Sequence, residues 1–172
     1  DGSYQPFARY VPSSAGNEKK LPLLVYLHGY SPRLNIINWN EIPKSLIEFA
    51  EKEGYYILAP FGRSNTDFQS IGEQDVFAAI DHFKRRYAVD ESRIILVGIS
   101  MGGMGAWTIG VHYPHLFAGV LTVSGRADYY VWQGIARESV ASYKQTLIDA
   151  EFASTLLPNL KNTPVLCIHG SS

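Results

Sequence analysis

A glycine-flanked serine between two apolar segments constrains the fold of this chain more than any other feature. Gly98, Ser100 and Gly102 stand in the run Gly-Ile-Ser-Met-Gly, directly after the apolar run Arg93–Val97. The segment that follows, Gly103–Trp107, consists of small and mostly apolar residues. A strand that turns sharply into a helix leaves no space for a Cβ at either glycine. An ordinary glycine-rich turn would not need these flanks, so the pattern predicts a nucleophile elbow that lifts the serine hydroxyl above the sheet.

Apolar runs alternate with helical patterns along the chain, which predicts an α/β fold with a mostly parallel sheet and helices on both faces. Strands are expected at residues 7–12, 21–28, 55–60, 93–97, 117–123 and 164–168. Helices are expected at residues 41–53, 72–87 and 100–112, and a longer, partly helical excursion at 129–160. Gly54 is placed as the C-terminal cap of the first helix.

The composition is that of a globular domain and excludes several other classes. Hydrophobic residues make up 46% and charged residues 18% of the 172 residues. The net charge of −1 gives no reason to expect nucleic acid or an anionic membrane surface as a partner. No apolar run reaches the length of a membrane span. The single cysteine, Cys167, lies in an apolar run and is interpreted as a buried small hydrophobe.

Backbone N–H groups beside the serine are the second requirement of such a site, because they stabilise the charge that develops on the carbonyl oxygen. One donor is expected from Met101, at the start of the helix behind the serine. The other is expected from the loop after the strand at 21–28, where Gly29 allows a close backbone approach and Tyr30 presents its N–H. The alternative for this loop is an ordinary turn at the end of a strand.

Six segments, in order along nearly the whole chain, resemble the α/β-hydrolase superfamily. They are Leu27–Tyr30, Ala59–Pro60, Val89–Ile94, Gly98–Gly103, Tyr113–Ala118 and Pro164–Gly170. Within it the chain looks most like the bacterial esterases related to feruloyl and acetylxylan esterases, and the catalytic domain of the prolyl oligopeptidase group is a near neighbour. The resemblance implies the α/β-hydrolase fold for residues 1–172, with the C-terminal side of the domain incomplete.

The resemblance also implies that Ser100 is the nucleophile and that an acid and then a histidine base follow it along the chain. In such enzymes the acid comes soon after a stretch like His169–Ser172. We therefore expect the acid and the base beyond Ser172, in further residues or in a separate chain. The start at Asp1, without Met, leaves a further N-terminal domain open.

Asp128 is the alternative within the chain for the acid, since some relatives place theirs after the strand that follows the elbow. The competing interpretation is a solvated loop carboxylate. Asp149 and Glu151 are interpreted as solvated helix charges. His28 and His169 lie at strand ends and are interpreted as hydrogen-bonded packing groups rather than as the base.

Two aromatic residues of the excursion, Tyr129 and Trp132, are candidates for the substrate pocket, with packing on the sheet as the alternative. No Cys/His cluster has metal-ligand spacing, and no cofactor is expected. The resulting hypothesis is a serine carboxylesterase for small esters with short-chain or aromatic acyl groups. A prolyl-oligopeptidase-like peptidase and a non-catalytic binding domain of the same fold are the alternatives. The esterase resemblance favours a secreted or cell-envelope bacterial protein.

Overall fold

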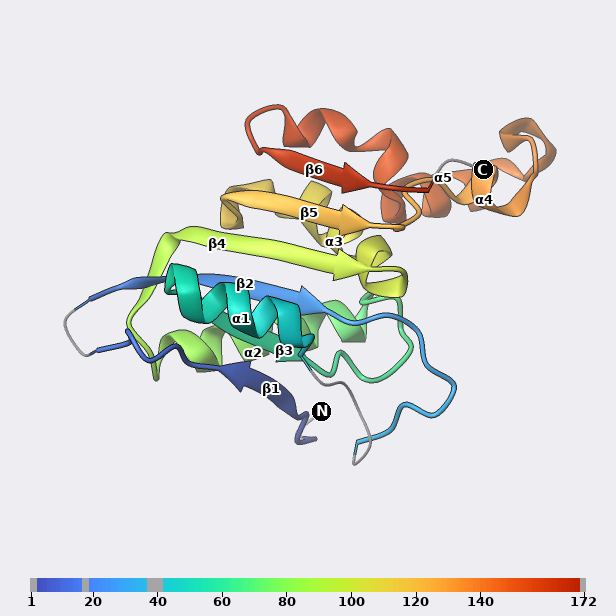
Figure 1. The fold of residues 1–172 in the computed structure, drawn as a ribbon. Coiled ribbons are helices and arrows are strands. Elements are labelled where there is room, and N and C mark those ends of the chain that lie inside the picture. The colour runs from blue at the N-terminus through green and yellow to red at the C-terminus, as the bar shows by residue number, and fades with distance from the viewer. Residues whose placement is uncertain (1–2, 17–18, 37–41, 171–172) are drawn as a thin grey trace.

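The computed structural model describes residues 3–16, 19–36 and 42–170. They form a six-stranded sheet in the order β1-β3-β2-β4-β5-β6 (Figure 1). The strands are β1 (Phe7–Tyr10), β2 (Leu21–Leu27), β3 (Tyr56–Pro60), β4 (Val89–Ile99), β5 (Gly119–Val123) and β6 (Val165–Ile168). β1 pairs antiparallel with β3, and the other neighbours pair in parallel. The predicted α/β fold with a mostly parallel sheet is therefore confirmed.

Helices cover both faces of the sheet, as predicted (Figure 1). The long ones are α1 (Lys44–Glu53), α2 (Ile71–Lys84) and α3 (Met101–His112). On the face of α1, Ala50 belongs to one buried cluster with Leu24. On the other face, Phe83 of α2 and Ile109 of α3 join the larger cluster. All residues of β2 are buried, because a central strand of such a sheet has no solvent side.

The predicted excursion between β5 and β6 begins beside the carboxyl ends of these two strands, and its last part returns to the start of β6 (Figure 1). It contains α4 (Tyr129–Gln133), the 3₁₀ turn η2 (Arg137–Ser139), α5 (Ser142–Glu151) and the turns η3 (Ala153–Thr155) and η4 (Leu157–Leu160). A further turn, η1 (Pro114–Leu116), follows α3. None of the helices described is both long and apolar enough to cross a bilayer.

Several boundaries differ from the sequence prediction. β4 begins at Val89, four residues before the predicted start. α1 begins after Pro43, which disfavours helical backbone at Ile42, while Glu41, the predicted start, lies outside the described residues. α2 ends at Lys84 instead of continuing to Tyr87, since residues 85–87 turn back toward β4.

The interpretation of Cys167 as a buried residue is wrong. Within the described residues, β6 is the last strand on its side of the sheet, and all four of its residues are exposed. His169, directly after this strand, has its Nδ1 3.2 Å from the carbonyl oxygen of Gly170, but it is exposed, so only the packing part of its interpretation is wrong. An apolar run predicts a strand, but it does not show which strand lies at the edge of the sheet.

Candidate active site

Ser100 occupies the turn between β4 and α3 in a strained backbone conformation. Its φ of 55° and ψ of −116° lie in a region that residues with a Cβ rarely adopt. The N–H of Ser100 donates to the carbonyl oxygen of Val123 at 2.8 Å, and its own carbonyl accepts from Met104 at 3.1 Å. The side chain is exposed and does not cap the helix, so its hydroxyl is available to a ligand.

The two glycines of the motif are needed for the steric reason that the sequence indicates. A Cβ on Gly98 would lie 1.9 Å from the carbonyl oxygen of Gly102. A Cβ on Gly102 would lie 2.0 Å from the carbonyl oxygen of Leu27. At both positions the new Cβ would meet backbone atoms, so neither collision can be relieved by turning a side chain. The expected tight crossing of strand and helix is confirmed.

Gly29 differs from these two glycines. A Cβ there would lie 3.5 Å from the carbonyl oxygen of Ile99 and 3.6 Å from the Cβ of Ser100, which is ordinary contact. The loop after β2 does pass directly beside Ser100, as expected. The space nevertheless admits a methyl group, so the close approach alone does not require glycine at this position.

The two expected N–H donors lie at the same pocket. Met101 is the first residue of α3, and Tyr30 lies in the loop after β2. Within the described residues, neither backbone N–H takes part in a hydrogen bond. Both groups therefore remain able to donate to a ligand, and the N-terminus of α3 adds a partial positive charge beside Met101.

A cavity of about 430 Å³ opens at Ser100. Its lining comes from the loops and helices that follow β2, β3, β4 and β5, which is where ligands bind in sheets of this kind. The lining residues are Tyr30, Asp67, Ser100, Met101, Met104, Ser124, Arg126 and Trp132. The structure thus brings the predicted nucleophile, both predicted donor residues and Trp132 together.

Trp132 lines this pocket, whereas Tyr129 is not among the lining residues. The Tyr129 ring instead contacts those of Trp132 and Phe152 edge-on or at a tilt, with centroids 6.1 and 5.2 Å away. Tyr129 therefore packs against Trp132, the aromatic residue that lines the pocket, without lining the pocket itself.

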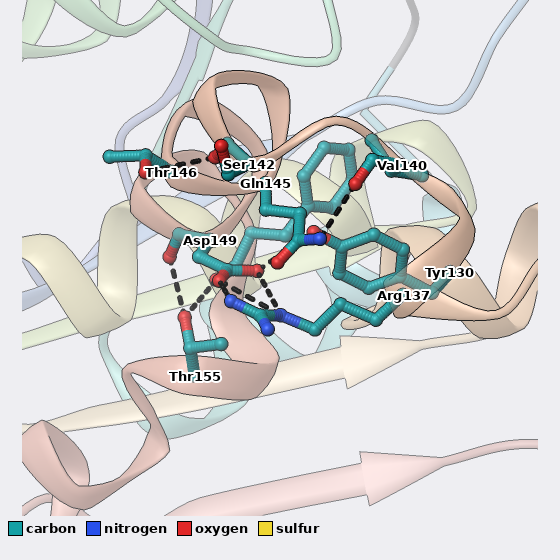
Figure 2. Close-up of polar contacts among 9 residues, drawn as sticks. Tyr130, Arg137, Val140, Ser142, Gln145, Thr146, Asp149 and Thr155 are labelled. Carbon is teal, nitrogen blue, oxygen red and sulfur yellow. Dashed lines mark hydrogen bonds and ion pairs between the residues drawn. The ribbon is translucent and has the colours of Figure 1, made fainter.

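A polar cluster fastens the excursion that carries Trp132 (Figure 2). Arg137 forms an ion pair with Asp149, and the Tyr130 hydroxyl donates to the same carboxylate at 3.0 Å. The cluster joins α4 to α5, so it holds the helix that presents Trp132. Asp149 is thus not the solvated helix charge that the sequence suggests. The Arg137 guanidinium, with a further contribution from Tyr130, holds the pKa of Asp149 below its usual range.

Replacing Asp149 with asparagine is expected to lower the melting temperature near neutral pH. A carboxyl whose pKa is depressed in the folded state contributes stability above its unfolded pKa of about 3.9 and loses it as pH falls through the folded value. The difference between wild type and Asp149→Asn should therefore begin to narrow below about pH 4 and close only below the lowered pKa of the folded state. Glu151→Gln, on the same helix, is the control in thermal unfolding from pH 3 to 7. A difference that is as large at pH 3 as at pH 7 would contradict this role for Asp149.

Asp128 has a structural role in α4. Its carboxylate accepts a hydrogen bond from the Val131 N–H at 2.9 Å, as an N-cap does, and it does not line the Ser100 pocket. This geometry favours neither the catalytic acid nor a merely solvated carboxylate.

His28 is 1% exposed, and its two ring nitrogens lie 2.9 and 3.0 Å from the carbonyl oxygens of Gly29 and Phe61. Its interpretation as a hydrogen-bonded packing group is confirmed. None of the described histidines lines the pocket.

Sequence reasoning missed three polar residues of the pocket: Asp67, Ser124 and Arg126. Each lies in a loop directly after a strand, which is the signal that could have found them. Ser124 shares the unusual backbone of Ser100, with a φ of 53°. Among the described residues, no group of three or more His, Cys, Asp or Glu side chains is arranged to hold a metal ion.

A serine in such an elbow, at the carboxyl edge of a parallel sheet, defines the serine hydrolases of the α/β-hydrolase fold. The prolyl oligopeptidase family profile matches residues 66–172, which is more than half of the chain. The chain belongs to the prolyl oligopeptidase family.

Known relatives include esterases and peptidases. A bifunctional acetylxylan esterase/xylanase of Neocallimastix patriciarum is 35% identical over 99 residues, 55% of this chain and 14% of that protein. Fluorophosphonate-binding serine hydrolase F of Staphylococcus aureus has a TM-score of 0.73 at 15% identity, over 99% of this chain and 74% of that one. Pyrococcus horikoshii acylaminoacyl peptidase has a TM-score of 0.65 at 19% identity, over 96% of this chain and 29% of that one. The chain spans only part of each relative, and the structural likenesses concern the fold alone.

Proposed function

We propose that this chain carries the nucleophile of a serine esterase that hydrolyses carboxylic esters with short-chain or aromatic acyl groups. The observation that carries the proposal is the backbone of Ser100, strained at φ 55° between β4 and α3 with its hydroxyl open to the pocket. This backbone places the Ser100 hydroxyl in the same pocket as Met101 and Tyr30, the two expected N–H donors, which is the arrangement that acyl transfer needs. The 35% identity to a protein named as an acetylxylan esterase supports an ester substrate.

In the proposed reaction, the Ser100 hydroxyl oxygen attacks the ester carbonyl while a base takes its proton. The N–H groups of Met101 and Tyr30 hold the oxyanion. The alcohol leaves with the proton from the base, and water then attacks the acyl-enzyme in the same manner. We place the histidine base and its acid outside residues 1–172, as the resemblance implies.

A peptidase is the second candidate, because the family profile that matches residues 66–172 is that of prolyl oligopeptidases. The acyl-enzyme steps are the same, and only the leaving group differs. An amide needs a more effective proton donor for its amine than an ester needs for its alcohol.

Substrate comparison on the full-length protein that contains this chain separates the candidates. Hydrolysis of p-nitrophenyl acetate and butyrate is measured beside that of peptide p-nitroanilides, with Ser100→Ala as the background. An esterase is expected to hydrolyse the esters in a Ser100-dependent manner, with kcat/KM at least about a hundredfold above that for any p-nitroanilide, since amides are the harder substrates. A high kcat/KM for a peptide anilide would favour the peptidase. No Ser100-dependent turnover of either would refute both.

A further inference from the structure

The Ser100 pocket contains a guanidinium and a carboxylate that ester hydrolysis does not require. Arg126 follows β5, and Asp67 lies in the loop between β3 and α2, yet both line the cavity that contains Ser100. The proposed reaction uses a nucleophile, two N–H donors, a base and an acid. A fixed cation is none of these, so its position beside the nucleophile indicates a role in choosing the substrate.

Arg126 packs against the ring of Trp132, which lines the same pocket. The carbon at the centre of its guanidinium lies 4.2 Å from the centroid of the Trp132 ring, within the range of a cation–π contact. Trp132 in turn lies on α4, which the Asp128 cap and the Arg137–Asp149 cluster hold in place. Arg126 is exposed, and its guanidinium lies against this supported ring.

The hydrogen-bond donors of Arg126 remain available. In the part of the chain that the structure describes, Arg126 forms no direct ion pair and no side-chain hydrogen bond. A guanidinium has five N–H donors in a planar fork that matches the two oxygens of a carboxylate. Such a bidentate contact is the usual way in which arginine selects an anionic group.

Asp67 is the only carboxylate among the lining residues, and it neutralises the charge of Arg126 only in part. It is partly buried in a strained loop, with a φ of 55°. Burial raises the pKa of Asp67, and the charge of Arg126 lowers it. Desolvation thus disfavours the charge on Asp67, whereas Arg126 always keeps its own. A bound anion would also disfavour the Asp67 charge, and by the same repulsion the Asp67 charge opposes the binding of the anion.

We propose that the preferred substrates of this pocket are esters that carry a carboxylate group within a few atoms of the scissile carbonyl, and that Arg126 binds this carboxylate. The proposal rests on the proposed esterase function and names a substrate class for the same site. Asp67 opposes the bound carboxylate and so limits how tightly it is held.

Matched esters test the proposal on the full-length protein. p-Nitrophenyl hemisuccinate is compared with p-nitrophenyl levulinate, in which a methyl ketone replaces the carboxylate. p-Acetoxybenzoate is compared with its methyl ester, which places the charge on the leaving group. Wild type is expected to prefer the charged member of at least one pair by about tenfold in kcat/KM. A preference in the first pair would place Arg126 beside the acyl group, and one in the second pair would place it beside the leaving group.

Variants assign the preference to the pocket. Arg126→Met is expected to lose the preference while still hydrolysing the neutral esters, and Asp67→Asn is expected to increase it. Arg93→Met is the control, and it should keep the preference. It also removes a positive charge, but Arg93 lies in β4 and pairs with Asp90 at 2.7 Å. Equal rates for charged and neutral esters in wild type, or a preference that survives Arg126→Met, would overturn the proposal.

A binding measurement separates this proposal from the esterase function. Calorimetry with monomethyl succinate on Ser100→Ala needs no turnover. Binding that is lost in the Ser100→Ala, Arg126→Met double variant supports the anion site even if neither neutral ester is hydrolysed. Ser100-dependent hydrolysis of neutral esters without such binding would keep the esterase and refute the anion site.

Discussion

Replacing Ser100 with alanine is expected to lower the hydrolysis of p-nitrophenyl esters by about 10⁴- to 10⁶-fold, because it removes the hydroxyl that forms the acyl-enzyme in the proposed reaction. The thermal stability should change little, since the Ser100 side chain caps no helix and alanine keeps the same strained backbone. Initial rates and thermal unfolding of the same preparations measure the two effects. Full esterase activity in Ser100→Ala would show that the elbow does not carry the nucleophile.

Ser70 provides a matched control for this experiment. It precedes α2 with φ 50° and ψ −110°, nearly the backbone of Ser100, and its side chain also makes no capping hydrogen bond. It does not line the Ser100 pocket. Ser70→Ala should therefore keep the ester hydrolysis of wild type, which would show that the loss in Ser100→Ala comes from the hydroxyl and not from a disturbed helix start.

Replacing Gly102 with alanine is expected to destabilise the fold by about 3 kcal/mol or more and to abolish activity with it. Helix propensity alone would favour alanine by about 1 kcal/mol. The new Cβ, however, would lie 2.0 Å from the carbonyl oxygen of Leu27 and 2.6 Å from that of His28, so α3 must move away from β2. The collision therefore outweighs the propensity. Urea unfolding followed by tryptophan fluorescence measures the loss.

Gly29 is the control for this steric argument. A Cβ there would make only ordinary contacts, at 3.5 Å or more. Gly29→Ala should leave the free energy of unfolding within about 1 kcal/mol of wild type. If Gly102→Ala proves as stable as Gly29→Ala, the tight crossing between the elbow and β2 is not a constraint on the fold.

The elbow and the order of strands and helices could be predicted because they depend on neighbours in the chain. Gly102 is recognised from the motif, although the backbone that its Cβ would meet is that of the distant Leu27 in β2. A strand needs an apolar run, a helix needs its period, and the turn at Ser100 needs glycine at 98, where a Cβ would meet the nearby backbone of Gly102. These requirements act over a few residues and are therefore visible in the sequence. The family resemblance supplied the loop at Tyr30 in addition.

The composition of the pocket and the exposure of β6 could not be predicted in the same way. Asp67 and Arg126 are separated by 58 intervening residues, and they line one cavity only because β3 and β5 end at the same edge of a parallel sheet. The ion pair of Arg137 with Asp149 likewise depends on how the turn η2 packs against α5. The sequence alone determined the elbow and the strand pattern, through local sterics and periodicity. Only the tertiary structure decided which charges meet beside Ser100, because that depends on the order of strands across the sheet.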